Sequence, residues 1–206
     1  MTRVRTVRKL GADDLSAAIG ILARGMRDNP LHICAFGREA DVRGARLHRM
    51  FTVALPIIFE KGVLLGAFEG DALVGVAGMA LPGRCQPLAR EKVALLPRLI
   101  PRIGFGAFGR VGRWLRAWGV QDLAEPHWHL GPVAVDAHLQ GQGIGRVLMT
   151  EYCAQLDRVR AIGYLETDKP ENVVFYKKFG FQTIAEAPVL DTPNWFMRRP
   201  ALNGDT

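Results

Sequence analysis

The sequence lacks the long apolar run that a membrane-spanning helix requires, because none of its 206 residues lies in a stretch of eighteen consecutive apolar residues. The first five residues are not followed by the apolar core of a signal peptide. We therefore expect a cytoplasmic protein without a membrane span. A hydrophobic content of 49% in a chain of this length supports a single domain with a substantial core. We expect that domain to cover residues 1–200, with a disordered tail at 201–206.

Cysteine is scarce, with only Cys34, Cys85 and Cys153 in the chain. The number is odd and no Cys-x-x-Cys spacing occurs, so the sequence predicts neither a disulfide framework nor a metal site. We expect three reduced thiols.

Acidic residues are almost absent from residues 84–119, where Glu91 is the only one. Prolines and glycines in this segment predict broken helices, and we expect a basic helical excursion that covers a ligand cleft. Such a segment can also bind a membrane surface or nucleic acid. No aromatic and basic motif of a known nucleic-acid module is present, so we expect no nucleic-acid partner. The basic residues are Arg84, Arg90, Lys92, Arg98, Arg102, Arg110, Arg113 and Arg116.

A glycine-rich loop at residues 140–146 joins a strand-like run, Leu130–Val135, to a helix-like run that begins at Ile144. Glycine permits positive φ and removes the Cβ that would hold a ligand away, while the first N–H groups of a helix lack intrahelical partners. The loop therefore predicts a cradle for a phosphate group. A dinucleotide fingerprint would need glycine where Arg146 stands, and no Gly-Lys-Ser/Thr of a P-loop is present. A glycine turn without a ligand is the alternative for this loop alone.

The first half of the chain predicts an edge strand at 2–7 and then an amphipathic helix that follows Asp13 and Asp14 and ends near Asn29-Pro30. A second helix is predicted over 38–61, where Pro56 should kink or divide it. The runs 63–68 and 73–79 then predict a β-hairpin.

The second half predicts a strand from His127 to Val135 that is interrupted at Gly131-Pro132, where we expect a bulge or a separation from the neighbouring strand. After the glycine loop and its helix, which we expect to end at Gly163, comes a short strand at 164–167. The next helix is capped by Asn172, and two strands follow at 181–185 and 194–198. This order gives a βαβα unit with a parallel pair at its centre.

Residues 129–181 resemble the acyl-CoA-binding core of the GNAT N-acetyltransferase superfamily. The resemblance is carried by Val133-Ala134-Val135, Gln140-x-x-Gly143-x-Gly145, Asn172-x-x-x-Tyr176 and Gly180-Phe181. It covers about the last 80 residues, and Gln140 departs from the arginine that many relatives have. It implies an α/β (α+β) fold of GNAT type, with a mixed, mostly antiparallel central sheet, a parallel splayed strand pair and flanking helices.

The resemblance also implies acetyl-CoA as the donor and a primary amine of a small molecule as the acceptor. The loop N–H groups would bind the pyrophosphate, and the interrupted strand would leave backbone groups free for the pantetheine amides. The expected cofactor-binding residues are Val133, Ala134, Val135, Gln140, Gly141, Gln142, Gly143, Ile144, Gly145, Arg146 and Asn172.

Tyr176 lies one helical turn after Asn172, so the two side chains share a face. The resemblance implies that Tyr176 protonates the departing thiolate and that Asn172 contacts the cofactor. For the base that takes a proton from the amine, Glu166 is the first candidate, with His129, Asp168 or a water path as alternatives.

Within the superfamily, four segments most resemble the puromycin N-acetyltransferase-like branch: Trp128-His129-Leu130, Leu165-Glu166-Thr167, Phe175-Tyr176-x-x-Phe179-Gly180-Phe181 and Trp195-x-Met197. A positive rim with Trp114, Trp118 and Trp128 favours an uncharged or acidic aromatic amine over a cationic polyamine. A homodimer is also compatible with the sequence. The alternative function is a CoA-binding sensor, or a protein that binds nucleic acid or membranes through residues 84–116.

Overall fold

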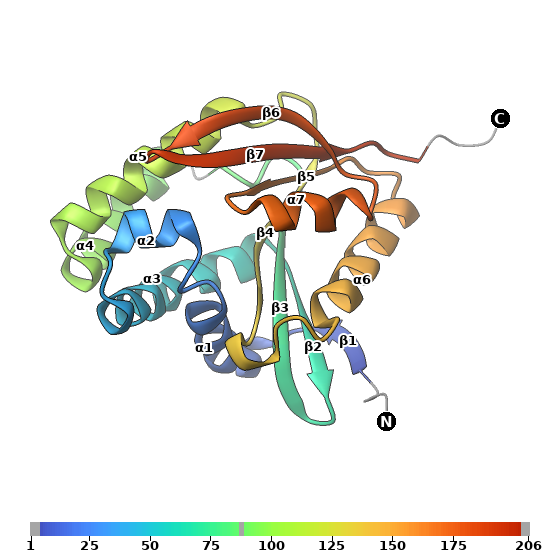
Figure 1. Cartoon of the computed structure of the whole chain (residues 1–206), viewed down its shortest axis with the longest axis horizontal. Coiled ribbons are helices and arrows are strands. Elements are labelled where there is room, and N and C mark those ends of the chain that lie inside the picture. The colour runs from blue at the N-terminus through green and yellow to red at the C-terminus, as the bar shows by residue number, and fades with distance from the viewer. Residues whose placement is uncertain (1–4, 87–88, 203–206) are drawn as a thin grey trace.

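A computed structural model of the chain describes residues 5–86 and 89–202. Its strands form a seven-stranded sheet in the order β1-β2-β3-β4-β5-β7-β6 (Figure 1). Every neighbouring pair is antiparallel except β4 and β5, which are parallel. The expected mixed, mostly antiparallel sheet with one parallel pair is confirmed. The strands are β1 (Arg5–Lys9), β2 (Gly62–Glu69), β3 (Ala72–Ala80), β4 (Trp128–Val135), β5 (Gly163–Thr167), β6 (Gln182–Val189) and β7 (Thr192–Arg199).

Helices cover both faces of the sheet and enclose one hydrophobic core on each (Figure 1). Alternate residues of one strand enter different cores: Tyr164 of β5 packs with the helices of the first half, and the adjacent Leu165 packs with α6 and α7. None of the described helices is long and apolar enough to cross a membrane. The helices are α1 (Leu15–Gly25), α2 (Pro30–Phe36), α3 (Ala40–Lys61), α4 (Ala89–Ile103), α5 (Phe105–Gln121), α6 (Ile144–Arg158) and α7 (Pro170–Lys177), with short 3₁₀ turns at Ala12–Asp14 and Ala137–Leu139.

The N-terminal half differs from the sequence prediction in where its helices begin and end. Strand β1 extends to Lys9, whereas positions 2–4 of the predicted strand lie outside the described residues. Helix α1 ends at Gly25, and Asn29-Pro30 begins the further helix α2 instead of ending α1. Proline suits the first position of a helix because its missing N–H would have no partner there. Helix α3 continues through Pro56, so the predicted division is wrong.

The excursion consists of two helices that separate at Gly104, one of the glycines of the segment, whereas its prolines do not interrupt α4. Gly104 has φ +83°, which the right-handed helix cannot accommodate, while Pro97 and Pro101 both lie inside α4. Helix α5 of the excursion is hydrogen-bonded to α2 and β7. Arg110 Nε donates to the carbonyl of Ala35 at 2.8 Å, and Trp118 Nε1 donates to Asn194 Oδ1 at 3.1 Å.

The predicted interruption of β4 is present. The Gly131-Pro132 peptide bond is cis, and the register with β3 shifts between the pairs Ala77↔Val133 and Met79↔Leu130. Strand β4 pairs with β5 only through Trp128↔Gly163 and His129↔Tyr164, after which the two strands diverge (Figure 1). This divergence opens the sheet at its centre.

Candidate active site

The glycine loop forms a left-handed turn into α6. Gly141 and Gly143 have φ +78° and +83°, and Gly143 occupies the N-cap position of the helix. These are conformations that residues with a Cβ rarely adopt. Gly145 lies in the first turn of α6 with ordinary helical φ, and a Cβ there would meet Phe175 Cζ at 3.6 Å. Two of the three glycines are thus needed for the backbone conformation itself.

The loop presents a row of backbone donors. Within the described part of the chain, the N–H groups of residues 141 to 145 donate to no acceptor. The N–H of Arg146, which we expected to be free, donates to the carbonyl of Gly143 at 3.1 Å because the first turn of the helix tightens. The positive end of the α6 dipole adds to this row of donors. Together they suit an anion.

An open cleft of about 610 Å³ joins this loop to the divergent edge of β4 and to α7. Val133, Ala134 and Val135 line it, and within the described residues these positions have no ladder partner on β5. The cleft brings together nine of the predicted cofactor residues; Gln142 and Ile144 do not line it. The nine are Val133, Ala134, Val135, Gln140, Gly141, Gly143, Gly145, Arg146 and Asn172.

Helix α7 contributes Asn172 and Tyr176 to the same cleft. The predicted cap is wrong: Lys169 is the N-cap and Pro170 follows it, while Asn172 lies inside the helix and donates from Nδ2 to Thr167 Oγ1 at 3.1 Å. Burial, with a smaller contribution from Asp168, raises the pKa of Tyr176 to about 12. The phenol therefore stays protonated at neutral pH and can donate a proton.

Sequence reasoning missed two lysines and one glycine of this cleft. Lys169 and Lys178 flank α7 and, with Arg146, place positive charge around it. Gly25 ends α1 against β4, where a Cβ would lie 2.3 Å from the carbonyl oxygen of Val135. Lysines next to a helix resemble an ordinary solvated surface, and a glycine 110 residues upstream of Val135 carries no local signal of that contact.

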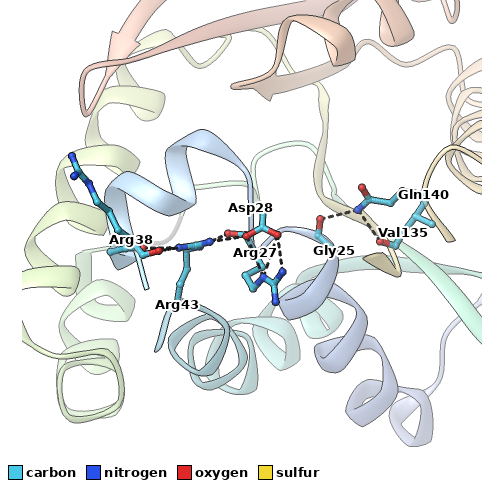
Figure 2. A network of polar contacts seen from close by, with 8 residues as sticks. Gly25, Arg27, Asp28, Arg38, Arg43, Val135 and Gln140 are labelled. Atoms are coloured by element: carbon cyan, nitrogen blue, oxygen red, sulfur yellow. Dashed lines mark hydrogen bonds and ion pairs between the residues drawn. The ribbon is translucent and has the colours of Figure 1, made fainter. Parts of the chain in front are cut away.

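Gln140 connects the loop to α1. Its Nε2 donates to the carbonyls of Gly25 at 3.1 Å and Val135 at 3.3 Å, and Figure 2 shows the amide pointing between these two oxygens. The glutamine at the position where many relatives have arginine is thus used for a contact with two backbone carbonyls.

A buried arginine of α3, Arg43, which is 4% exposed, joins the turn between α1 and α2 to the connection between α2 and α3. Its guanidinium donates to the carbonyls of Arg27, Gly37 and Arg38 at 2.6, 2.9 and 2.7 Å and to Asp28 Oδ1 at 2.6 Å (Figure 2). Hydrogen bonds from Arg27, which has the larger effect, and from Arg43 lower the pKa of the Asp28 carboxyl to about 2. Because Gly25 and Asn29 line the cleft, this network holds one of its walls.

The candidate bases lie elsewhere. Glu166 does not line the cleft: its side chain is 2% exposed, and its Oε2 lies 2.7 Å from His129 Nε2. Burial alone would lower the pKa of His129, but the charge of Glu166 and, more weakly, that of Asp122 raise it to about 10. Asp168 accepts from the N–H of Leu31 at 2.7 Å, and burial raises its pKa.

The three tryptophans expected to form a rim do not gather. Trp114 is buried, 6% exposed, and lies edge-on to Trp118 with ring centroids 5.1 Å apart. Trp128 packs with the core on the opposite face of the sheet, because its position in β4 points to that side. The predicted aromatic set is therefore wrong.

Comparison with known proteins gives one family match and several solved structures of the same fold. Residues 101–183 match the family model described as acetyltransferase (GNAT) domain. The structure of a histone acetyltransferase HPA2 and related acetyltransferase from Corynebacterium glutamicum superposes with a TM-score of 0.75 at 20% identity, covering 98% of this chain and 99% of that one.

Two further structures contain a ligand. A GNAT family acetyltransferase from Brucella melitensis in complex with acetyl-CoA superposes with a TM-score of 0.54 at 18% identity, covering 99% of this chain and 92% of that chain. The PaiA N-acetyltransferase from Thermoplasma acidophilum in complex with coenzyme A has a TM-score of 0.60 at 14% identity, covering 96% of this chain and 99% of that chain. This protein thus has the fold of the GNAT acetyltransferases, and its residues 101–183 match their domain.

Proposed function

We propose that this protein is an acetyl-CoA-dependent N-acetyltransferase that transfers the acetyl group to a primary amine of a small molecule by direct attack. The observation that carries the proposal is the single cleft that joins the free N–H groups of the glycine loop, the unpaired edge of β4 and Tyr176. The match to the acetyltransferase (GNAT) domain and the solved structures with acetyl-CoA or coenzyme A support it.

In this proposal the N–H groups of residues 141 to 145 bind the pyrophosphate of acetyl-CoA, with Gln140 and Arg146 beside it. Lys169 and Lys178 add positive charge at the rim of the cleft. The pantetheine amides pair with the backbone of residues 133 to 135, as an added strand would. Asn172 of α7 contacts the cofactor from the other side of the cleft.

The amine attacks the thioester carbonyl directly. A backbone N–H near Val133 stabilises the negative charge that develops on the carbonyl oxygen, an effect typically worth roughly 3–4 kcal/mol. As the C–S bond breaks, Tyr176 gives its phenolic proton to the coenzyme A thiolate. A tyrosine with the ordinary pKa of 10 already carries this proton at neutral pH, and burial raises the pKa of Tyr176 further.

For the base, Glu166 remains our first candidate. It cannot take a proton directly from an amine in the cleft, because its carboxylate is buried beside His129. We propose that a chain of water relays the proton, with Glu166 as the final acceptor. His129 is not itself a base when its pKa is raised, since it already carries the proton. Asp168, at the end of β5, is the alternative.

The acceptor is proposed only by class. The puromycin N-acetyltransferase-like branch, a cytoplasmic location and a homodimer remain predictions from the sequence. The preference for an uncharged or acidic aromatic amine loses the tryptophan rim on which it rested. None of the described residues of α4 or α5 lines the cleft, and a covering role of the excursion remains a prediction from the sequence.

Isothermal titration with acetyl-CoA tests whether the protein binds the proposed cofactor. We expect one binding site, and no heat at high micromolar acetyl-CoA would contradict it. A screen of coenzyme A release over antibiotic amines, amino acids and peptides then tests transfer. Binding of acetyl-CoA without release in any amine, together with salt-sensitive binding to DNA or anionic vesicles, would favour the sensor alternative.

Replacing Tyr176 by phenylalanine tests the role of the acid. We expect kcat to fall by on the order of 10²-fold while acetyl-CoA affinity changes little, because the ring stays and only the proton is lost. Tyr152→Phe is the matched control, since Tyr152 is buried in α6 and its hydroxyl donates to the carbonyl of Trp128 outside the cleft. Equal kcat in Tyr176→Phe and the wild type across the pH range would remove Tyr176 from the mechanism.

A further inference from the structure

Four potential metal ligands meet at the base of the excursion. Cys85 precedes α4, Asp122 follows α5, His127 precedes β4, and His129 lies in β4. One ligand atom from each residue lies within 4.8 Å of the corresponding atoms of the other three. The sequence predicted no metal site, because these residues are spread over 45 positions and only the two histidines are close in sequence.

The distances suit a small tetrahedral ion. His127 Nε2 lies 3.0 Å from Asp122 Oδ1 and 3.9 Å from Cys85 Sγ, and Cys85 Sγ lies 3.4 Å from Asp122 Oδ2. Bonds of roughly 2.0–2.3 Å to zinc would place neighbouring ligand atoms roughly 3.3–3.8 Å apart. The distances among Cys85, Asp122 and His127 are near that spacing, and side-chain rotation would have to bring the ligand atom of His129, now within 4.8 Å of the others, to it.

Both imidazoles are already oriented for coordination. The Nδ1 of His127 lies 2.9 Å from the carbonyl oxygen of Glu125, which leaves Nε2 facing the cluster. His129 uses Nε2 for Glu166 at 2.7 Å, and its Nδ1 is buried without a hydrogen-bond partner among the described residues. Metal-binding histidines commonly donate their second N–H to a carbonyl or a carboxylate in this way.

The donor set selects the metal. The thiolate of Cys85 is a soft ligand and the two imidazoles are intermediate, and such ligands favour zinc over magnesium or calcium. The carboxylate of Asp122 is the fourth ligand and completes a closed tetrahedral set. The alternative is a cluster of ion pairs and hydrogen bonds alone among Cys85, Asp122, Glu166 and the two histidines. That arrangement leaves His129 Nδ1 buried without a hydrogen-bond partner among the described residues, at an energetic cost.

We propose that Cys85, Asp122, His127 and His129 bind one zinc ion that fastens both ends of the α4–α5 excursion to the start of β4. Binding displaces the thiol proton of Cys85 and one proton from each protonated imidazole, and four ligand–metal bonds form without any redox change. Glu166 then accepts the Nε2–H of the coordinated His129 and holds that ring in place. The proposal does not depend on acetyl transfer.

The test uses the full chain, washed with a chelator and reconstituted with zinc or cobalt. We expect about one equivalent of zinc by elemental analysis after desalting, and a thiolate-to-cobalt charge-transfer band with intense tetrahedral d–d bands in the cobalt protein. Cys85→Ser should abolish the charge-transfer band and weaken zinc binding at least about 100-fold in a chelator competition. Cys34→Ser, which changes the exposed cysteine, is the matched control and should bind as the wild type.

Asp122→Asn provides a second ligand variant in case Cys85→Ser fails to fold, and it should also weaken zinc binding. Glu166→Gln should weaken it about 10–100-fold, because the carboxylate only orients a ligand. Three results would overturn the proposal: less than a tenth of an equivalent of zinc after reconstitution, cobalt binding without a thiolate band, or equal affinities of the ligand variants and the wild type. Any of these results would mean that the four residues form a cluster of ion pairs and hydrogen bonds without a metal ion.

Discussion

Gly143 shows how one residue couples the backbone to the proposed binding site. Its φ of +83° ends the turn and starts α6, and it lines the cleft. A side chain at such a φ costs about 1–2 kcal/mol even where space is open. Gly143 therefore has two roles: it permits the backbone conformation of the turn, and it lets a ligand approach the backbone closely.

We expect Gly143→Ala to lower the free energy of unfolding by about 1–2 kcal/mol and to weaken acetyl-CoA binding. Gly109→Ala is the matched control: Gly109 lies inside α5, and its Cβ would meet nothing within 4 Å, so helix propensity should stabilise this variant by up to about 1 kcal/mol. Urea denaturation and calorimetric titration measure both effects. Equal stability of the two variants would contradict this account of the turn.

His32 is a buried histidine that the proposed mechanism does not use. It lies edge-on to Trp114 with ring centroids 5.1 Å apart, and its Nδ1 has no hydrogen-bond partner among the described residues. Burial, with the charges of Lys169 and Arg43, lowers its pKa to about 3. The folded protein therefore keeps it neutral where the unfolded chain would protonate it.

Stability should depend on pH through this group. Between the ordinary pKa of 6.5 and the folded pKa of about 3, the unfolded chain binds one more proton at His32, so stability falls as pH falls. The slope from one group is at most about 1.4 kcal/mol per pH unit. We expect His32→Phe to reduce the slope of unfolding free energy between pH 6 and pH 4, and the exposed His48→Gln to leave it unchanged. Parallel wild-type and His32→Phe curves would refute the assignment.

At the scale of elements, the turn between α1 and α2 is held from α3. Arg43 is buried and donates four hydrogen bonds, three to backbone carbonyls and one to Asp28, so the protein satisfies most of its five N–H donors. Residues on either side of this turn line the cleft. A change in α3 should therefore reach the proposed ligand site through the turn.

We expect Arg43→Met to destabilise the fold by about 2–4 kcal/mol, because three backbone carbonyls and Asp28 lose their buried donor. It should also weaken acetyl-CoA binding by loosening the wall at Gly25. Arg49→Met removes an exposed arginine from the same helix and should change stability by less than about 0.5 kcal/mol. Denaturation midpoints of both variants measure the difference, and similar midpoints would show that the network adds little.

At the scale of the whole molecule, the sheet is joined at its centre by only two residue pairs between β4 and β5. Beyond them the two halves diverge, and the cleft lies where ladder hydrogen bonds would otherwise form. A ligand that pairs with β4 and contacts α7 would bridge these halves. Ligand binding should therefore raise the free energy of unfolding of the whole protein.

We expect acetyl-CoA at about 100 times its Kd to raise the free energy of unfolding by about 2.7 kcal/mol, since it binds only the folded state. Pantetheine, which lacks the nucleotide and the pyrophosphate, should give a much smaller rise at the same concentration. Thermal unfolding measures both. Equal shifts for the two ligands would contradict the role proposed for the glycine loop.

Local chemistry made much of this fold predictable. The hairpin of β2 and β3, the interruption at Gly131-Pro132 and the turn into α6 each depend on residues within a few positions of one another. The errors also have local causes. Proline is unfavourable inside a helix, yet Pro30 begins α2 and Pro56 lies within the continuous helix α3.

The sequence by itself therefore determined the order of elements apart from α2, together with the glycine loop, because period, turn chemistry and helix starts are short-range properties. The identity of the cofactor came from the resemblance of residues 129–181 to a known family. Only the tertiary structure decided which distant side chains meet: Gly25 against β4, Glu166 against His129, and Cys85 and Asp122 beside the two histidines. Such pairings depend on the strand order and on how the excursion folds back, and side-chain identity in a local window does not encode them.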